Sequence, residues 1–188
     1  MQWTLSNQLT VARVALIPLL IVAFYFTPDP WNHYTTAFIF ALAGFTDWLD
    51  GYLARNRNEV TAFGRFLDPV ADKLLVATSL VLLVEGSYAP AILAVVIIGR
   101  EITIGALREW LAEGSTVVHV SQMGKWKTAM QLFAIEALFL HIEIMDFNFH
   151  QAGLVLLCLA AVLTLWSGYE YLRNAWLELR NQGHTKES

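Results

Sequence analysis

The chain of 188 residues has little charge and only one cysteine. Charged residues make up 15% of it and hydrophobic residues 56%, which is typical of a membrane protein rather than a soluble domain. The single cysteine excludes an intramolecular disulfide, and the apolar run around Cys158 predicts a buried, unreactive thiol. No metal-ligand spacing relates the five histidines, which we expect to be loop residues: His33, His119, His141, His150 and His184.

Six apolar segments each approach the ~20 residues that a helix needs to cross a bilayer. We therefore expect six transmembrane helices, over about Leu9–Phe26, Tyr34–Leu53, Asp68–Val84, Ala89–Leu107, Ala129–Ile144 and Ala152–Leu172. Asp68 and Pro69 are suited to cap and begin the third helix. The fifth segment is short unless its helix begins near Gln122. Met1–Gln8 lacks the basic start of a cleavable signal and predicts a short interfacial segment.

Basic residues are absent from one side of this predicted bundle. The turns near Thr27–His33, Glu85–Tyr88 and His141–His150 contain none, and all 12 lysines and arginines lie on or toward the side that holds both termini. Because lysine and arginine are enriched in the cytoplasmic loops of membrane proteins, we expect that side to face the cytoplasm. The expected fold is an all-α integral membrane protein, with six transmembrane helices around a cytoplasm-facing polar cavity.

Four aspartates lie close together between apolar runs: Asp47, Asp50, Asp68 and Asp72. An unpaired charge inside a membrane costs at least ~2.5–3.5 kcal/mol, and four carboxylates would also repel one another. One or two divalent cations with hard oxygen ligands, as Mg²⁺ prefers, would offset this charge. A solvated acidic loop is the alternative, but Asp47 and Asp50 end an apolar span and share a face. The cluster therefore points to phosphate chemistry at a membrane.

The first two aspartates share a helical stripe with small residues and an arginine. Asp47, Asp50, Gly51, Ala54 and Arg55 fall within about 140° on a helix. The small residues leave room for a large ligand, and the arginine can bind an anion in a bidentate manner. The stripe suits a metal-bound diphosphate with a bulky head group. Helix packing for the small residues and a positive-inside position for the arginine remain the alternatives.

The pattern D-x-x-D-G-x-x-A-R-x8-G-x3-D-x3-D, from Asp47 to Asp72, resembles the signature of the CDP-alcohol phosphotransferases, with every fixed position filled. The motifs N-Q-L-T-V-A-R, A-D-K-L, G-R-E-I and G-K-W-K-T extend the resemblance over nearly the whole chain. They are similar to the branch that makes phosphatidylglycerophosphate. The resemblance implies one membrane domain over residues 1–188, a bacterial cytoplasmic (inner) membrane, and a homodimer.

The resemblance also implies the reaction and the roles of the aspartates. The hydroxyl of sn-glycerol 3-phosphate attacks the lipid-side phosphorus of CDP-diacylglycerol, and CMP leaves. Asp47, Asp50 and Asp68 would coordinate two divalent ions, Mg²⁺ or Mn²⁺. Asp72 would lie near these metals and act as the general base, because the attacking alcohol must lose its proton.

Further residues match the family's nucleotide site. Gly51, Ala54 and Arg55 correspond to the CDP-binding stripe, and Gly64 would allow close backbone approach or a turn. Asn7 and Thr10 lie one turn apart and are candidates for contacting the cytidine or for supporting the metal-bearing helix. A plain helix cap is the alternative for these two residues.

Basic residues of the fourth and fifth helices could bind the acceptor phosphate. Lys125 and Lys127 begin the fifth helix, and a helix N-terminus with two ammonium groups forms an anion site. Arg100, well inside the fourth helix, and Arg108 could close this site. Two flanking positive-inside lysines, or an ion-pair network of the arginines with Glu101, are the alternatives.

Other functions fit the residues less well. A different acceptor alcohol, such as inositol phosphate or serine, would use the same chemistry. Membrane prenyltransferases resemble D-x-x-D-x-x-x-D placed twice and far apart, which this chain lacks, and a metal transporter would leave the Gly51–Arg55 stripe without a purpose. Glu136, deeper in the fifth helix, receives no role. Tryptophans near the span ends indicate an aromatic belt at the membrane interface, not a nucleic-acid partner: Trp3, Trp31, Trp110, Trp126 and Trp176.

Overall fold

The computed structural model describes residues 5–57, 62–113, 123–141, 143–144 and 147–185. These residues form six α-helices and one pair of very short strands. The helices are α1 (Leu5–Phe26), α2 (Trp31–Arg57), α3 (Ala62–Glu85), α4 (Ala91–Glu113), α5 (Met123–Leu140) and α6 (Phe149–Thr185). Strands β1 (Glu143–Ile144) and β2 (Phe147–Asn148) pair antiparallel between α5 and α6. The expectation of an all-helical chain is therefore confirmed.

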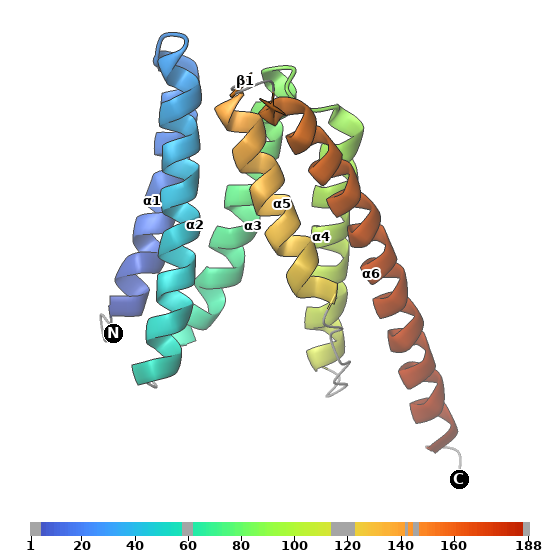
Figure 1. Cartoon of the computed structure of the whole chain (residues 1–188). Helices are drawn as coiled ribbons and strands as arrows, with labels where there is room; N and C mark the ends of the chain where they lie inside the picture. The colour runs from blue at the N-terminus through green and yellow to red at the C-terminus, as the bar shows by residue number, and fades with distance from the viewer. Residues whose placement is uncertain (1–4, 58–61, 114–122, 142, 145–146, 186–188) are drawn as a thin grey trace.

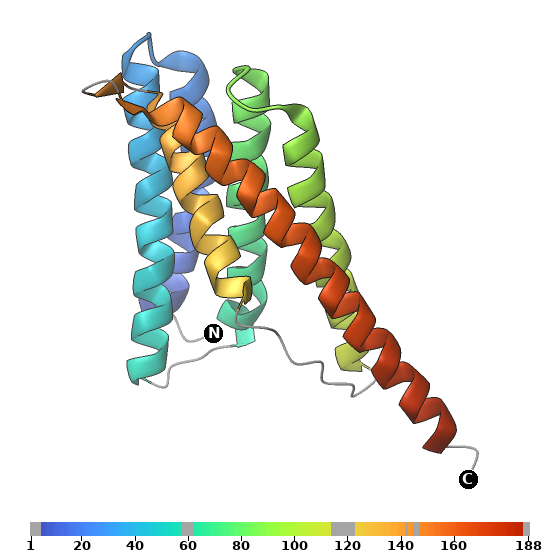
Figure 2. The same ribbon diagram turned by 45° about the vertical axis from the view of Figure 1, so that its right-hand side comes forward.

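Successive helices run in opposite directions through one bundle (Figure 1). The turns α1–α2 and α3–α4 and the strand pair lie at one end, and both termini lie toward the other (Figure 1). The most extensive packing joins α5 to α6 and α1 to α2. Helix α6 crosses the bundle obliquely and extends past it at its C-terminal end (Figure 2). This arrangement brings the C-terminal end of α2 and the first turns of α3 to the end that holds the termini.

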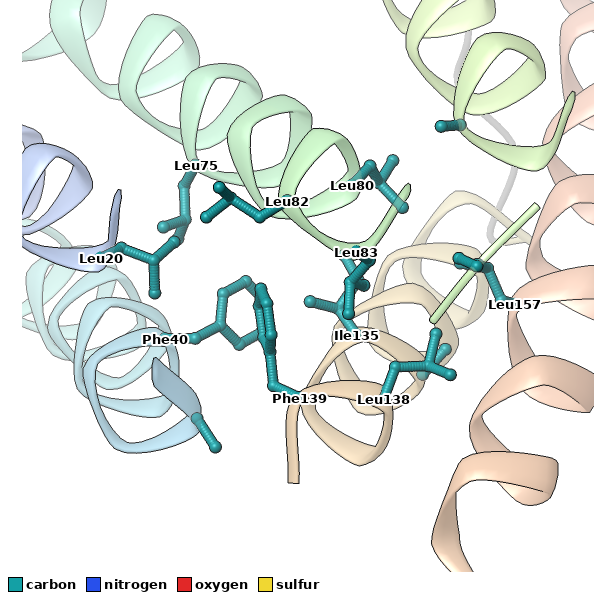
Figure 3. Close-up of a cluster of buried hydrophobic side chains, with 14 of the residues drawn as sticks. Leu20, Phe40, Leu75, Leu80, Leu82, Leu83, Ile135, Leu138, Phe139 and Leu157 are labelled. Atoms are coloured by element: carbon teal, nitrogen blue, oxygen red, sulfur yellow. The ribbon is translucent and has the colours of Figure 1, made fainter. Parts of the chain in front are cut away.

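A hydrophobic core fills the middle of the bundle (Figure 3). Leu20 of α1, Leu83 of α3 and Leu138 of α5 are fully buried in it. Large apolar side chains also cover the outside of the helices, among them Phe38 and Phe133, which are 68% and 70% exposed. By length and composition, two segments could cross a membrane, Asn7–Phe26 and Phe149–Glu178, when the described residues are searched.

Four local predictions were wrong or incomplete. Helix α5 ends at Leu140, four residues before the predicted end, because His141 takes the left-handed conformation (φ 43°) that terminates a helix. Helix α3 begins at Ala62, so Pro69 lies inside it instead of in its first turn. Cys158 is exposed on the surface of α6, not buried. The N-terminal segment from Leu5 onward is continuous with α1.

Candidate active site

Three helices bring the four aspartates together. Asp47 and Asp50 come from the C-terminal part of α2, and Asp68 and Asp72 come from α3. Helix α1 packs against both α2 and α3 and supplies the side chains between them. The side chains of Asp47 and Asp72 are 48% and 50% exposed, whereas that of Asp50 is 5% exposed. The cluster therefore has one buried member and two members that can meet a ligand.

Arg13 of α1 lies at the centre of this cluster and is fully buried. Its Nη1 atom is 2.9 Å from Asp47 Oδ1 and 2.9 Å from Asp72 Oδ1, and its Nη2 atom is 3.6 Å from Asp50 Oδ2. A buried guanidinium is costly unless carboxylates surround it, and here they do. This role of Arg13 was not predicted from the sequence, in which Arg13 is one of the 12 basic residues on or toward the cytoplasmic side. Its place in the N-Q-L-T-V-A-R motif, three residues after Thr10, was the available signal.

Thr10 joins the two aspartate pairs from the same face of α1. Its hydroxyl oxygen is 2.9 Å from Asp50 Oδ2 and 2.6 Å from Asp68 Oδ1. A hydroxyl has one hydrogen, so it donates to one carboxylate at a time. The helix-cap alternative for Thr10 is wrong, because the residue lies inside α1 and its side chain contacts aspartates. Asn7, one turn earlier, is buried as well.

The aspartates provide the ligand type that Mg²⁺ and Mn²⁺ prefer, namely carboxylate oxygens. One guanidinium cannot balance four carboxylates when these are ionised, and divalent cations would offset the remaining negative charge. In the described part of the chain, no three His, Cys, Asp or Glu side chains are placed to hold a metal ion as they stand. Arg13 lies between Asp47 and Asp72 in this arrangement. The donor chemistry therefore fits, while ligation requires the aspartate side chains to move.

The nucleotide-site candidates are only partly described. Gly51 follows Asp50 in α2 and is exposed, so a ligand can reach the backbone there. Gly64 is buried near the start of α3. The side chains of Ala54 and Arg55 lie outside the described residues. In the part of the stripe that is described, Asp47 and Gly51 are accessible and Asp50 is buried.

A cavity of about 380 Å³ opens beside Asp72, between α3, α4 and α5. Its wall is largely apolar, with five polar or charged side chains: Asp72, Lys73, Glu101, Thr128 and Gln131. The cavity thus joins the exposed end of the aspartate cluster to the helices that carry the acceptor-site candidates. An organic substrate of a few carbon atoms fits this volume.

Arg100 and Lys127 meet on Glu101, which lines the same cavity. The buried ammonium of Lys127 donates to Glu101 Oε1, and Arg100 Nη1 donates to that oxygen at 3.2 Å. Arg100 Nη2 also donates to Ser167 Oγ of α6 at 2.8 Å. The Arg100 side chain packs against Gly168 of α6. A Cβ atom added at Gly168 would lie 3.3 Å from Arg100 Cγ. The ion-pair alternative for Arg100 therefore holds in this structure, with Glu101 as a shared partner.

The other two candidates for the acceptor site are Arg108 and Lys125, and the structure does not place them with Arg100, Glu101 and Lys127. Arg108 lies two turns further along α4, and its guanidinium carbon is 5.5 Å from the ring centroid of Tyr171. It is exposed, and no ion pair between Arg108 and Glu101 is present among the described residues. The side chain of Lys125 lies outside the described residues. The structure thus brings Arg100 and Lys127 together and separates Arg108 from them.

The expectation of loop histidines was wrong for His33 and His150, which lie in the first turns of α2 and α6, and was confirmed for His141, which follows α5. His33 of α2, His141 after α5 and His150 of α6 form one aromatic cluster with Tyr88. The ring centroids of His33 and His141 are 5.4 Å apart, and those of His141 and His150 are 4.7 Å apart. Burial, followed by the Asp29 carboxylate, raises the pKa of the Tyr88 hydroxyl. The cluster packs together the turns far from the aspartates.

Comparison with known proteins adds a family and several relatives. The profile of the CDP-alcohol phosphatidyltransferase family matches residues 3–166. A protein of Pseudomonas fluorescens is 46% identical over 95% of this chain and 93% of its own length. Proteins of Haemophilus influenzae and Escherichia coli are each 45% identical, over 93% and 97% of this chain and 95% and 100% of their own lengths. All three are named CDP-diacylglycerol–glycerol-3-phosphate 3-phosphatidyltransferase.

Proposed function

Because the chain belongs to the CDP-alcohol phosphatidyltransferase family, we propose that it transfers the phosphatidyl group of CDP-diacylglycerol to sn-glycerol 3-phosphate. The products are phosphatidylglycerophosphate and CMP. The names of relatives that match nearly end to end support these substrates. The observation that carries the proposal is one cavity that joins Asp72 of the aspartate cluster to Glu101, the shared partner of Arg100 and Lys127.

The reaction forms one bond and breaks one bond at the same phosphorus. The terminal hydroxyl oxygen of glycerol 3-phosphate bonds to the phosphorus that carries the diacylglycerol. The bond from that phosphorus to the bridging oxygen breaks, and the electron pair leaves with CMP. Asp72 takes the hydroxyl proton, because it is the half-exposed aspartate that reaches the cavity. Arg13 orients the Asp72 carboxyl through its contact with Oδ1.

Members of this family generally depend on a divalent metal. Asp47, Asp50, Asp68 and Asp72 would hold two such ions, Mg²⁺ or Mn²⁺. When bound, the ions neutralise charge on the diphosphate and the departing nucleotide. The CDP portion would lie beside these ions and contact Gly51, Ala54, Arg55 and Gly64.

The acceptor phosphate would bind at the basic group on the far side of the cavity. Lys127 and Arg100 carry the positive charges, and both already share Glu101 there. Lys125 is adjacent in sequence to this end of α5, and Arg108 extends the basic surface along α4. A phosphate at this place would leave the glycerol hydroxyls directed into the cavity, toward Asp72.

The membrane arrangement completes the proposal. The helices range from 18 to 37 residues, and apolar side chains cover their outer faces. We propose a single multi-pass domain of six transmembrane helices in the bacterial cytoplasmic membrane, with both termini and the aspartates on the cytoplasmic side. Lipid substrate would enter from the bilayer, and glycerol phosphate and CMP would exchange with the cytoplasm. A homodimer is part of the same proposal.

An acceptor panel tests this function. Purified protein in detergent receives CDP-diacylglycerol, Mg²⁺ and one acceptor: glycerol 3-phosphate, inositol phosphate, serine or glycerol. CMP release should require glycerol 3-phosphate, and Asp72→Asn should abolish it. Release with inositol phosphate or serine instead would move the protein to another branch of the family. Release with no acceptor, or none at all, would contradict phosphatidyl transfer.

A further inference from the structure

The charged side chains in the cavity wall already have neighbours. The Lys73 ammonium lies against Gly105 of α4, where a Cβ atom would come within 2.6 Å of Nζ. Glu101 accepts from Lys127. Asp72 accepts from Arg13 at 2.9 Å and is the proposed base. These groups account for charge and proton transfer, but none of them is a neutral partner for the uncharged part of a substrate.

Gln131 is the uncharged polar side chain that remains. Of the two in the wall, Thr128 already interacts with another protein group. Gln131 is only 4% exposed, and among the described residues its amide makes no hydrogen bond to protein. The same cavity wall includes Val76, Ala77 and Ile98, which cannot hydrogen-bond through their side chains. The amide atoms of Gln131 are not among the fully buried side-chain atoms of the described residues that lack a partner, and the residue lines the cavity. Its amide is therefore suited to a polar group that enters the cavity.

The position of Gln131 defines which part of the acceptor it can meet. It follows Lys127 by four residues on α5, so both lie on one face and about 6 Å apart along the axis. Gln131 and Asp72 line the same cavity. An acceptor with its phosphate at Lys127 and its attacking hydroxyl toward Asp72 would therefore present the part between them, its central carbon, to Gln131.

We propose that the Gln131 side-chain amide hydrogen-bonds the central hydroxyl of the acceptor and thereby selects a three-carbon polyol phosphate. This inference rests on the proposed function. The amide offers both a donor and an acceptor, and a hydroxyl can use either. In an apolar wall, an acceptor without the central hydroxyl leaves the amide unpaired. Sites that bind a substrate hydroxyl discriminate strongly against the analogue that lacks it.

The test compares two acceptors that differ only at this position, glycerol 3-phosphate and 3-hydroxypropyl phosphate. The wild-type protein should prefer glycerol 3-phosphate by roughly tenfold or more in kcat/KM. In Gln131→Met, which keeps length but not the amide, the two kcat/KM values should come within about threefold of each other. The KM for CDP-diacylglycerol should stay unchanged. A ratio measured in one preparation is independent of the fraction of protein that folds.

Gln151→Met is the matched control, because Gln151 is exposed at the start of α6 and is not among the residues that line the cavity. It should keep the wild-type preference. Gln131→Asn, with a shorter amide, should show an intermediate preference and serves in place of Gln131→Met if that variant is inactive. Equal use of both acceptors by the wild type, or an unchanged preference in the Gln131 variants, would overturn the role of Gln131. Absence of CMP release by the wild type with every acceptor would instead refute the proposed function.

Discussion

Replacing Arg13 by methionine removes the buried cation on which three aspartates converge. The guanidinium lies 2.9 Å from carboxylate oxygens of both Asp47 and Asp72 and 3.6 Å from Asp50. It therefore connects α1 to α2 and α3 through charge. Without it, the aspartates repel one another, and α1 loses its ion pairs with the other two helices, although the Thr10 contacts remain.

The expected loss of stability follows from the two short contacts. A hydrogen bond between charged groups contributes about 1.5–3 kcal/mol. Asp47 and Asp72 are about half exposed, so solvent screens both contacts and the lower value applies to each. The loss is then about 3 kcal/mol, which for a chain of this size lowers Tm by roughly 6–12 °C.

Thermal unfolding in detergent, followed by tryptophan fluorescence, measures this change. Arg173→Met, which removes an exposed arginine of α6, is the matched control and should shift Tm by no more than about 2 °C. Arg13→Lys should recover only part of the loss, since one ammonium cannot reproduce the guanidinium fork. Mg²⁺ should raise Tm more in Arg13→Met than in the wild type, because the cluster has gained net negative charge. An unchanged Tm in Arg13→Met, or an equal Mg²⁺ response, would refute the central place of Arg13.

Three further predictions concern chemistry, the acceptor and topology. Asp72→Asn should abolish turnover but keep most binding of CDP-diacylglycerol, as measured with radiolabelled lipid, and near-normal turnover would remove Asp72 as the base. Lys127→Ala should raise the KM for glycerol 3-phosphate roughly tenfold or more, for a lost charged hydrogen bond of about 1.5–3 kcal/mol, with little change in the KM for CDP-diacylglycerol. Equal changes in both constants would assign Lys127 to helix packing. In a Cys158→Ser background, a cysteine at Asp29 should react with an impermeant thiol reagent outside intact cells and one at Glu178 should not. The reverse pattern would invert the membrane orientation.

The helices could be predicted from the sequence, because apolar segments of fixed length leave few choices. Each predicted span overlaps one observed helix, and the D-x-x-D spacing places Asp47 and Asp50 on one face of α2. The errors lie at helix ends. His141 ends α5 early through its backbone conformation, and Pro69 sits inside α3 because the helix begins before it. Hydropathy does not register either feature, since both depend on local backbone geometry.

The contacts within the site could not be predicted, because they join residues far apart in the chain. Arg13 meets Asp72 only because α1 packs against α3, and a scan along α1 finds only one isolated cation. Glu101 pairs with Lys127 on the next helix, whereas the sequence suggested only the arginines of α4 as its partners. Gln131 has no charge and belongs to no motif that signals chemistry. Its place in the cavity wall is what distinguishes it.

The central claim is that the acceptor hydroxyl itself attacks the lipid-bearing phosphorus at the aspartate cluster. Glycerol 3-phosphate labelled with oxygen-18 in its terminal hydroxyl tests this most directly, in an assay with purified protein, CDP-diacylglycerol and Mg²⁺. We expect CMP to appear only when the acceptor is present, and the lipid product to retain the label in its phosphodiester bridge. Formation of CMP without acceptor, or a lipid product that lacks the label, would contradict the account.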